Sequence, residues 1–134
     1  MTRFEIRGLD RDKLEVAYGV ASQRLLPWEL LNAPFEGAFC KLGPGEASDA
    51  HSHHEYELFI AMKGRAVLDE DGDERDFVAG DLAHHMPGTH HYVRNVGEGD
   101  FEWYAIWWDT DMSDRFRARH AQNPPVSESD SVQS

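Results

Sequence analysis

Residues 45 to 64 read GEASDAHSHHEYELFIAMKG, and this stretch carries the strongest structural signal in the chain. Three histidines and two glutamates lie within the seven residues from His51 to Glu57. Successive side chains of an extended strand alternate between its faces, so His51, His53 and Glu57 can project toward one point. Two imidazoles and a carboxylate can hold a first-row divalent metal and leave coordination positions open for a substrate. The stretch therefore predicts a metal site.

Spacing alone leaves the identity of the carboxylate ligand open. Glu55 has the same parity as His51 and His53, so it competes with Glu57 for this role. Any single histidine of the eight in the chain is more often a solvated or hydrogen-bonded residue than a ligand. The prediction of a metal site therefore rests on the whole set and its spacing.

The same residues resemble the first motif of the cupin family. In this motif a glycine, two histidines, a glutamate and a second glycine recur at set intervals. The matching positions here are Gly45, His51, His53, Glu57 and Gly64. By this resemblance the carboxylate ligand is Glu57 rather than Glu55.

A second cupin-like motif follows after a short interval. Its fixed positions are occupied by Gly80, Asp81, Gly88, His91 and Asn95. The proline that family members usually carry two residues before the motif glycine is replaced by Met86, and Pro87 stands one position later. This departure bears on whether His90 or His91 is the ligand, and the family spacing favours His91.

The resemblance takes in roughly residues 35 to 108 and implies an all-β fold. The expected architecture is a single cupin β-barrel of the jelly-roll type with an irregular N-terminal arm and a short C-terminal helix. It also implies a mononuclear centre of three histidines and one glutamate, namely His51, His53, Glu57 and His91. The cofactor would be one divalent transition metal, with zinc or iron expected first. Manganese, nickel and copper stay open, because divalent affinities follow the same order at almost any such site.

The chain divides into four expected parts: an arm at 1–34, the barrel at 35–109, a helix at 110–122 and a disordered tail at 123–134. In the arm, Pro27 and Pro34 interrupt the chain, residues 14 to 26 fit either helix or strand, and Phe4 to Arg7 could form an edge strand. Its apolar residues would cover a second subunit in a homodimer or the barrel of their own chain.

Short apolar segments separated by turn residues follow from Phe35 onward, which is typical of a β-barrel or sandwich. Asp71 and Gly72 are the residues that a tight hairpin turn requires. Thr110 is expected to cap the C-terminal helix. The expected strands cover residues 39–42, 56–62, 65–70, 73–78, 82–86, 91–96 and 101–108.

Length, charge and cysteine content limit the expected binding partners and the expected cellular compartment. A chain of 134 residues is most simply one domain, and its net charge of −12 disfavours nucleic acid and anionic membranes as partners. Cys40 is the single cysteine, so a reducing compartment is expected. The N-terminal segment is mixed and charged, unlike a signal peptide, and a cytoplasmic protein with a small-molecule substrate is predicted.

Further side chains are candidates for roles around the metal. His85 and Tyr104 are candidate general acid or base groups. The strand FEWYAIWW places Phe101, Trp103, Ala105 and Trp107 on one face, but the sequence does not say which face points inward. The candidate pocket residues are Phe39, Tyr56, Trp103 and Trp107.

Three function classes follow. The first is a metal-dependent enzyme acting on a compact polar metabolite, including a cupin dioxygenase or isomerase that uses iron, manganese or nickel. The second is a metabolite- or metal-sensing module without catalysis, and the third is a structural role.

A narrower resemblance falls within the enzyme class. HSHHEYELF and FEWYAIWWD look like the zinc cupin modules of bacterial hydrazine synthetases. That resemblance implies zinc and a rearrangement of an aminoacyl ester of an N-hydroxylated amine, which forms a nitrogen–nitrogen bond. It also implies a partner enzyme, similar to methionyl-tRNA synthetase, that supplies the activated substrate.

Overall fold

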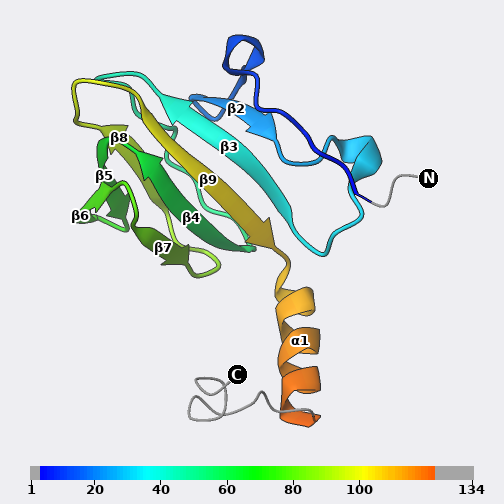
Figure 1. Ribbon diagram of the computed structural model, residues 1–134. Helices are drawn as coiled ribbons and strands as arrows, with labels where there is room; N and C mark the ends of the chain where they lie inside the picture. Colours follow the sequence, from blue (N-terminus) through cyan, green and yellow to red (C-terminus); the bar gives the residue numbers. More distant parts are fainter. Residues whose placement is uncertain (1–3, 123–134) are drawn as a thin grey trace, which may run out of the picture.

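The computed structural model describes residues 4–122, and two β-sheets enclose the core (Figure 1). The first sheet has six strands, in the order β1 (Glu15–Ala17), β2 (Val20–Arg24), β3 (Glu36–Leu42), β9 (Phe101–Trp108), β4 (Tyr56–Lys63) and β7 (Leu82–His85). The second has three, in the order β6 (Asp73–Val78), β5 (Arg65–Glu70) and β8 (His91–Asn95). All the strand pairs are antiparallel. This confirms the predicted all-β fold.

Most strand bounds agree with the sequence pattern, and the three strands expected at 65–70, 73–78 and 101–108 have those bounds. The hairpin turn at Asp71 and Gly72 has positive φ angles of 53° and 88°, as such a turn requires. The edge strand expected at Phe4 to Arg7 is wrong, because residues 4–10 contain no strand. The Phe4 side chain is exposed there, and β1 takes the outer edge of the sheet instead.

The N-terminal arm is only partly irregular. Residues 14 to 26, which fitted either helix or strand, contain the hairpin of β1 and β2. Tyr18 and Gly19 form its turn with φ angles of 53° and 77°, a pair of positive values that suits a two-residue hairpin. Because β2 pairs with β3, the sheet begins at Glu15, well before residue 35. The rest of the arm holds two 3-10 turns, η1 (Arg11–Lys13) and η2 (Trp28–Leu30).

The core lies between the two sheets. On the six-stranded sheet the cross-strand pairs Cys40 with Trp103 and Ala105 with Phe59 face inward. Val93 of β8 closes the core from the other sheet and is fully buried. The face of β9 that carries Phe101, Trp103, Ala105 and Trp107 is therefore the inner one.

The 3-10 turn η1 of the arm contacts the outer face of the same sheet. Arg11 of η1 forms a bidentate ion pair with Glu102 of β9, with Nε and Nη2 each 2.9 Å from a carboxylate oxygen. The Glu102 side chain is 5% exposed although it lies on the outer face. Its hydrogen bonds to Arg11 outweigh the opposing effect of burial and lower the pKa of Glu102, and the charges of Lys63 and Lys41 act in the same direction.

Glu102→Gln should therefore lower stability in a pH-dependent way. A carboxylate whose pKa is depressed in the folded state stabilises that state above the unfolded pKa, about 4.3, and this stabilisation is lost as the pH falls through the folded pKa. The variant is expected to melt a few degrees below the wild type at neutral pH and together with it in strong acid. Thermal melts across this pH range check the prediction. A difference that persists unchanged in acid would contradict it.

The C-terminal helix α1 (Thr110–Gln122) follows β9 and extends away from the sheets (Figure 1). Its N-terminal cap is Asp109 rather than Thr110, because Asp109 Oδ1 accepts a hydrogen bond from the Asp111 backbone N–H at 2.7 Å. Ser113 and Arg117 connect it to the barrel through Trp108 and Tyr56, yet no residue of the helix is buried. The predicted tail at 123–134 lies outside the described residues.

Within residues 4–122, no helix is long and apolar enough to cross a membrane.

Candidate metal centre

A loop and two strands bring the candidate ligands together. Glu57 lies on β4 and His91 begins β8, whereas His51 and His53 lie in the loop before β4. His51 and His91 form an antiparallel bridge in which each backbone N–H donates to the other's carbonyl, at 3.3 and 3.1 Å. The assumption of one continuous strand through His51, His53 and Glu57 is therefore wrong. The side chains converge through this bridge and the loop instead.

The four side chains form a compact donor cluster. One potential ligand atom from each of His51, His53, Glu57 and His91 lies within 4.8 Å of all the others. Glu57 Oε1 is 2.8 Å from His91 Nε2 and 3.2 Å from His53 Nε2. His91 and Glu57 are only 1% and 6% exposed, so the cluster is shielded from bulk water on that side.

Backbone carbonyls orient two of the imidazoles. His51 Nδ1 donates to the carbonyl of Asp49 at 3.0 Å, and His53 Nδ1 donates to that of Glu55 at 3.1 Å. A carbonyl oxygen only accepts, so each Nδ1 carries the ring proton and each Nε2 is left to act as a ligand. Metal-binding histidines are commonly oriented in this way. The donor set therefore fits a divalent transition metal.

The electrostatics of the cluster also favour a cation. Burial alone would raise the pKa of Glu57, but hydrogen bonds from His53 and His91 outweigh it and bring that pKa to about 2. The hydrogen bond to Glu57 raises the pKa of His53, against the opposing effect of burial. A negative charge thus lies at the middle of the cluster. A divalent cation bound here would replace the hydrogen bonds between these imidazoles and the carboxylate.

The structure separates the alternatives that spacing left open. Glu55 comes no closer than 4.0 Å to His53 Nδ1, on the side of the ring away from the cluster. His90 is exposed, and its backbone N–H donates to Asp71 Oδ1. Glu57 and His91 belong to the donor cluster, whereas Glu55 and His90 do not.

His85 packs behind the centre rather than in front of it. Its ring stacks on His91 with centroids 4.1 Å apart and planes 11° apart, and its Nδ1 donates to Glu70 Oε1 at 2.8 Å. Burial lowers the pKa of His85, and the hydrogen bond to Glu70 opposes this only in part. Ligand atoms of Glu70, His85 and His91 also lie within 4.8 Å of one another. His91 already belongs to the first cluster, however, and the lone pairs of two stacked rings point side by side rather than toward one ion, so this group suits a second metal poorly. An acid–base role for His85 stays a prediction.

A cavity of about 390 Å³ opens onto the donor cluster. All four candidate ligands contribute to its lining, so a small molecule inside it can contact them. Its floor is mostly apolar and is formed by Ala38, Cys40, Phe59, Trp103, Ala105 and Trp107. Its polar rim includes Tyr18, Ser22, Arg24, Glu36, Ser48 and Ser52.

Three candidate side chains lie on the outer face of the sheet, which corrects the expectation that they contribute to the cavity or the chemistry. Phe39 and Tyr104 pair across β3 and β9 and pack edge to face outside, with centroids 5.5 Å apart. Tyr56 stacks on Trp108, and its hydroxyl accepts from Arg117 of the helix. The reason is strand alternation, because their neighbours on each strand point inward.

Sequence reasoning missed most of the polar rim. Tyr18 stacks on the ring of His51 with centroids 5.1 Å apart, and Ser22 and Arg24 follow on the inner face of β2. A signal was present, because Tyr18 and Gly19 stand between two alternating segments and so favour a two-residue hairpin. That interpretation would have placed Ser22 and Arg24 on one face of a strand.

Cys40 contributes a neutral wall to the cavity. Burial, aided by the negative charge of Glu57, raises the pKa of this thiol well above its usual range. The side chain is 8% exposed and stays protonated near neutral pH, so it offers neither a thiolate ligand nor a nucleophile.

Chemically, the site joins the donor cluster, which could hold a cation, to a cavity with a mostly apolar floor. A bound divalent metal would supply Lewis-acid or redox chemistry, according to its identity. The chain itself orients the imidazoles and keeps Glu57 ionised. Trp103 and Trp107 of β9 give the cavity apolar walls, which limit the access of water to the donor cluster. The polar rim provides groups that can orient a substrate.

The chain is similar to a known protein family and to several solved structures. The model of the Cupin_2 family, described as a cupin domain, matches residues 38–107. A cupin 2 conserved barrel domain protein from Salinispora arenicola is 50% identical, with a TM-score of 0.77 over 89% of this chain and all of that one. The plu4264 protein from Photorhabdus luminescens is 39% identical, with a TM-score of 0.76 over 89% of this chain and 98% of that one.

Among curated proteins, the oxalate-binding protein of Thermotoga maritima is 31% identical over 67 residues, or 49% of this chain. This chain spans about half of that relative, 55% of its length. The matched family region includes all four residues of the donor cluster. The chain belongs to the cupin family.

Proposed function

We propose that this protein binds one divalent transition metal through His51, His53, Glu57 and His91 and uses it to transform a small polar metabolite. The observation that carries the proposal is the convergence of four ligand atoms within 4.8 Å at a cavity of about 390 Å³. That volume suits a metabolite and is far too small for a macromolecule. The ligand set is one that leaves coordination positions for a substrate.

Several reaction classes are compatible with this centre. Iron, manganese or nickel would suit oxygenation or isomerisation, and zinc would polarise a carbonyl or activate an ester. The zinc case includes the rearrangement of an aminoacyl ester to form a nitrogen–nitrogen bond, with a partner enzyme supplying the ester. The aromatic floor of the cavity would exclude water from a reactive ester, and this supports the rearrangement as one of the candidate reactions.

The first experiment measures bound metal and turnover together. The purified protein is analysed for transition metals, and metal-loaded and chelator-treated samples are incubated with small chelating metabolites and with an aminoacyl ester of an N-hydroxylated amine. Mass spectrometry then follows each compound. We expect one compound to be consumed by the metal-loaded sample alone. Equal consumption by both samples would contradict a metal-dependent reaction.

A second candidate function is metabolite binding without chemistry. The curated relative from Thermotoga maritima is named an oxalate-binding protein, which favours a small carboxylate as ligand. Calorimetry with oxalate and other carboxylates distinguishes the two functions. A ligand that binds the metal-loaded protein and is recovered unchanged would support binding alone.

Glu57→Gln should sharply weaken metal binding, because an amide is uncharged and a poorer ligand than a carboxylate. Loss of residues that merely orient a ligand costs about ten- to a hundredfold in affinity, so we expect a loss of at least a hundredfold or so here. Glu55→Gln is the matched control and should keep metal affinity near the wild-type value. Competition with a chromogenic chelator measures both variants. Equal losses in the two would refute the assignment of Glu57.

A further inference from the structure

We propose that Arg24, at the rim of the cavity, forms an oxyanion subsite that holds a carboxylate or phosphate of the substrate while another group of the same molecule lies at the metal centre. This inference rests on the proposed function and adds a substrate class to it. The predicted substrate is bifunctional, with a metal-binding group at one end and an anionic group at the other.

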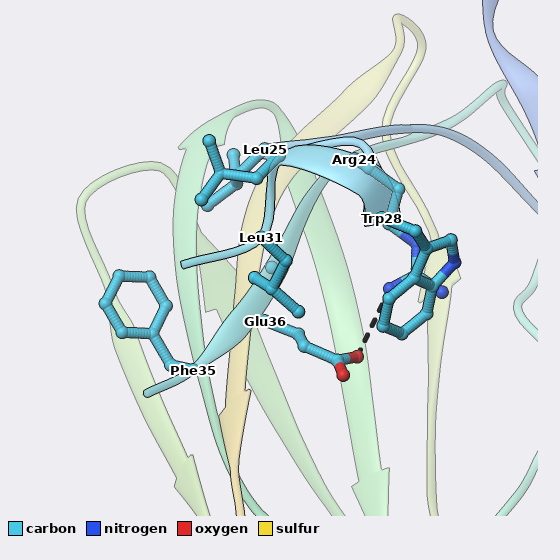
Figure 2. A pocket seen from close by; sticks show the side chains of 8 residues that line it. Arg24, Leu25, Trp28, Leu31, Phe35 and Glu36 are labelled. Carbon is cyan, nitrogen blue, oxygen red and sulfur yellow. Dashed lines mark hydrogen bonds and ion pairs between the residues drawn. The ribbon is translucent and has the colours of Figure 1, made fainter. Parts of the chain in front are cut away.

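The guanidinium of Arg24 is held in place by aromatic rings. Its Cζ lies 4.1 Å from the centroid of the Trp28 ring and 5.4 Å from that of Trp107. Figure 2 shows the Arg24 side chain beside the Trp28 ring, and the dashed line marks the ion pair between Arg24 and Glu36. Stacking occupies the faces of a guanidinium and leaves its N–H groups at the edge free to donate. An arginine fixed in this way needs little ordering when a ligand binds.

The hydrogen bonds around Arg24 leave donors unused. Arg24 Nη1 donates to Glu36 Oε2 at 3.2 Å, which uses one of its five N–H groups among the described residues. The same oxygen of Glu36 also accepts from Trp107 Nε1 at 2.9 Å. Glu36 thus orients Arg24 through an oxygen that is already shared. Among the described residues, Oε1 of Glu36 is left as an acceptor, and the guanidinium keeps four N–H donors, which suit an oxyanion.

The charges lining the cavity point to the same class of ligand. Of the described residues in the lining, Arg24 is the one lysine or arginine, whereas Glu36, Glu55 and Glu57 are acidic. The chain as a whole carries a net charge of −12, which repels anions. Within the cavity, negative charge can therefore be stabilised at two places, the metal centre and Arg24. Its side chain is 41% exposed, so a ligand can reach it from the mouth.

The strand register separates these two places. Glu36 lies opposite Trp107, and Trp107 lies opposite Glu57, so Glu36 and Glu57 are two strands apart on one row of the sheet. Neighbouring strands are about 4.8 Å apart, which puts roughly 10 Å between the two backbones. Arg24 pairs with Ala38 on the next strand outward. The metal centre and Arg24 therefore lie on different strands, and the predicted substrate must be long enough to contact both.

The test uses metal-chelating probes in place of the unknown substrate. Aliphatic hydroxamates of graded chain length are made with a terminal carboxylate, phosphonate or methyl group, and their binding to the metal-loaded protein is measured by calorimetry. The hydroxamate anchors at the metal, and the other end samples the rim. At the best length we expect the anionic probes to bind about ten- to a hundredfold tighter than the methyl probe, the range of a charge-assisted hydrogen bond.

Arg24→Gln should abolish this preference and leave the affinity for the methyl probe unchanged. The matched control is Arg94→Gln, because the Arg94 side chain is 42% exposed and ion-paired with Glu74 outside the cavity. It should keep the preference. The carboxylate and phosphonate arms show which oxyanion is favoured, and unchanged melting temperatures show that both variants are folded.

The outcomes separate this inference from the proposed function. Hydroxamates that bind the wild type equally well with anionic and methyl ends would overturn the Arg24 subsite and leave the metal centre intact. A preference that survives Arg24→Gln would also overturn it. If no hydroxamate binds the metal-loaded wild type, the result contradicts the proposed metal centre, on which the proposed function depends.

Discussion

His91→Ala is expected to reduce bound metal from about one ion per chain to nearly none. His91 is 1% exposed, its Nε2 lies 2.8 Å from Glu57 Oε1, and its backbone is bridged to His51. Removing the ring deletes a donor and leaves the negative charge of Glu57 without its buried partner. Elemental analysis after dialysis against a weak chelator measures the loss.

The matched control for this variant is His90→Ala. His90 is the adjacent residue in the chain, but its side chain is exposed and does not belong to the donor cluster. It should keep the wild-type metal content. If His90→Ala loses the metal and His91→Ala keeps it, the second motif is out of register with the family pattern and the site must be rebuilt around His90.

Asn95→Ala should destabilise the fold by about 3 kcal/mol. Asn95 is 2% exposed; its Nδ2 donates to the carbonyls of Leu42 and Gly99, and its Oδ1 accepts from the Gly97 N–H, each at 2.9 Å. Each buried hydrogen bond contributes about 1 kcal/mol, and the carbonyl of Leu42 would be left without this donor. The loss is a large share of a total stability of about 5 to 15 kcal/mol.

Urea unfolding of Asn95→Ala, compared with Asn32→Ala, checks this prediction. Asn32 is exposed, so the same chemical change there should alter stability by no more than about 0.5 kcal/mol. Equal, small effects at the two sites would show that the asparagine closing the second motif does not hold β8 to the loop before β9. A full loss of folding in Asn95→Ala alone would agree with the account.

The donor cluster was accessible from sequence because the ligand positions follow family spacing. His51, His53, Glu57 and His91 are the four residues that the structure brings together. The stated physical reason was partly wrong, since the two histidines of the first motif lie in a loop. Their convergence depends on a bridge between residues forty positions apart, and no local pattern contains that information.

The assignment of faces was where sequence reasoning failed. Alternation shows that Trp103 and Tyr104 point to opposite faces, but only the register between β9 and β4 shows which face is inner. Since Trp107 lies opposite Glu57, the odd-numbered residues of β9 face the core, and Tyr104 lies outside. By the same register, the side chains of Phe39 and Tyr56 lie on the outer face.

Arg24 was missed for a different reason. It lies in a segment that fitted either helix or strand, so its face was undefined until the hairpin of β1 and β2 was seen. Its partners Trp28 and Glu36 come from either side of an irregular stretch. Tertiary contacts bring these residues together, so their arrangement leaves no periodic pattern in the sequence from which it could be predicted.

The central claim is a mononuclear metal centre, and anomalous diffraction at the absorption edge of the bound metal tests it most directly. The account predicts one anomalous peak, surrounded by nitrogens of His51, His53 and His91 and an oxygen of Glu57 at about 2.0 to 2.2 Å. A peak at another position, or crystals of metal-loaded protein without a peak among these four side chains, would contradict it.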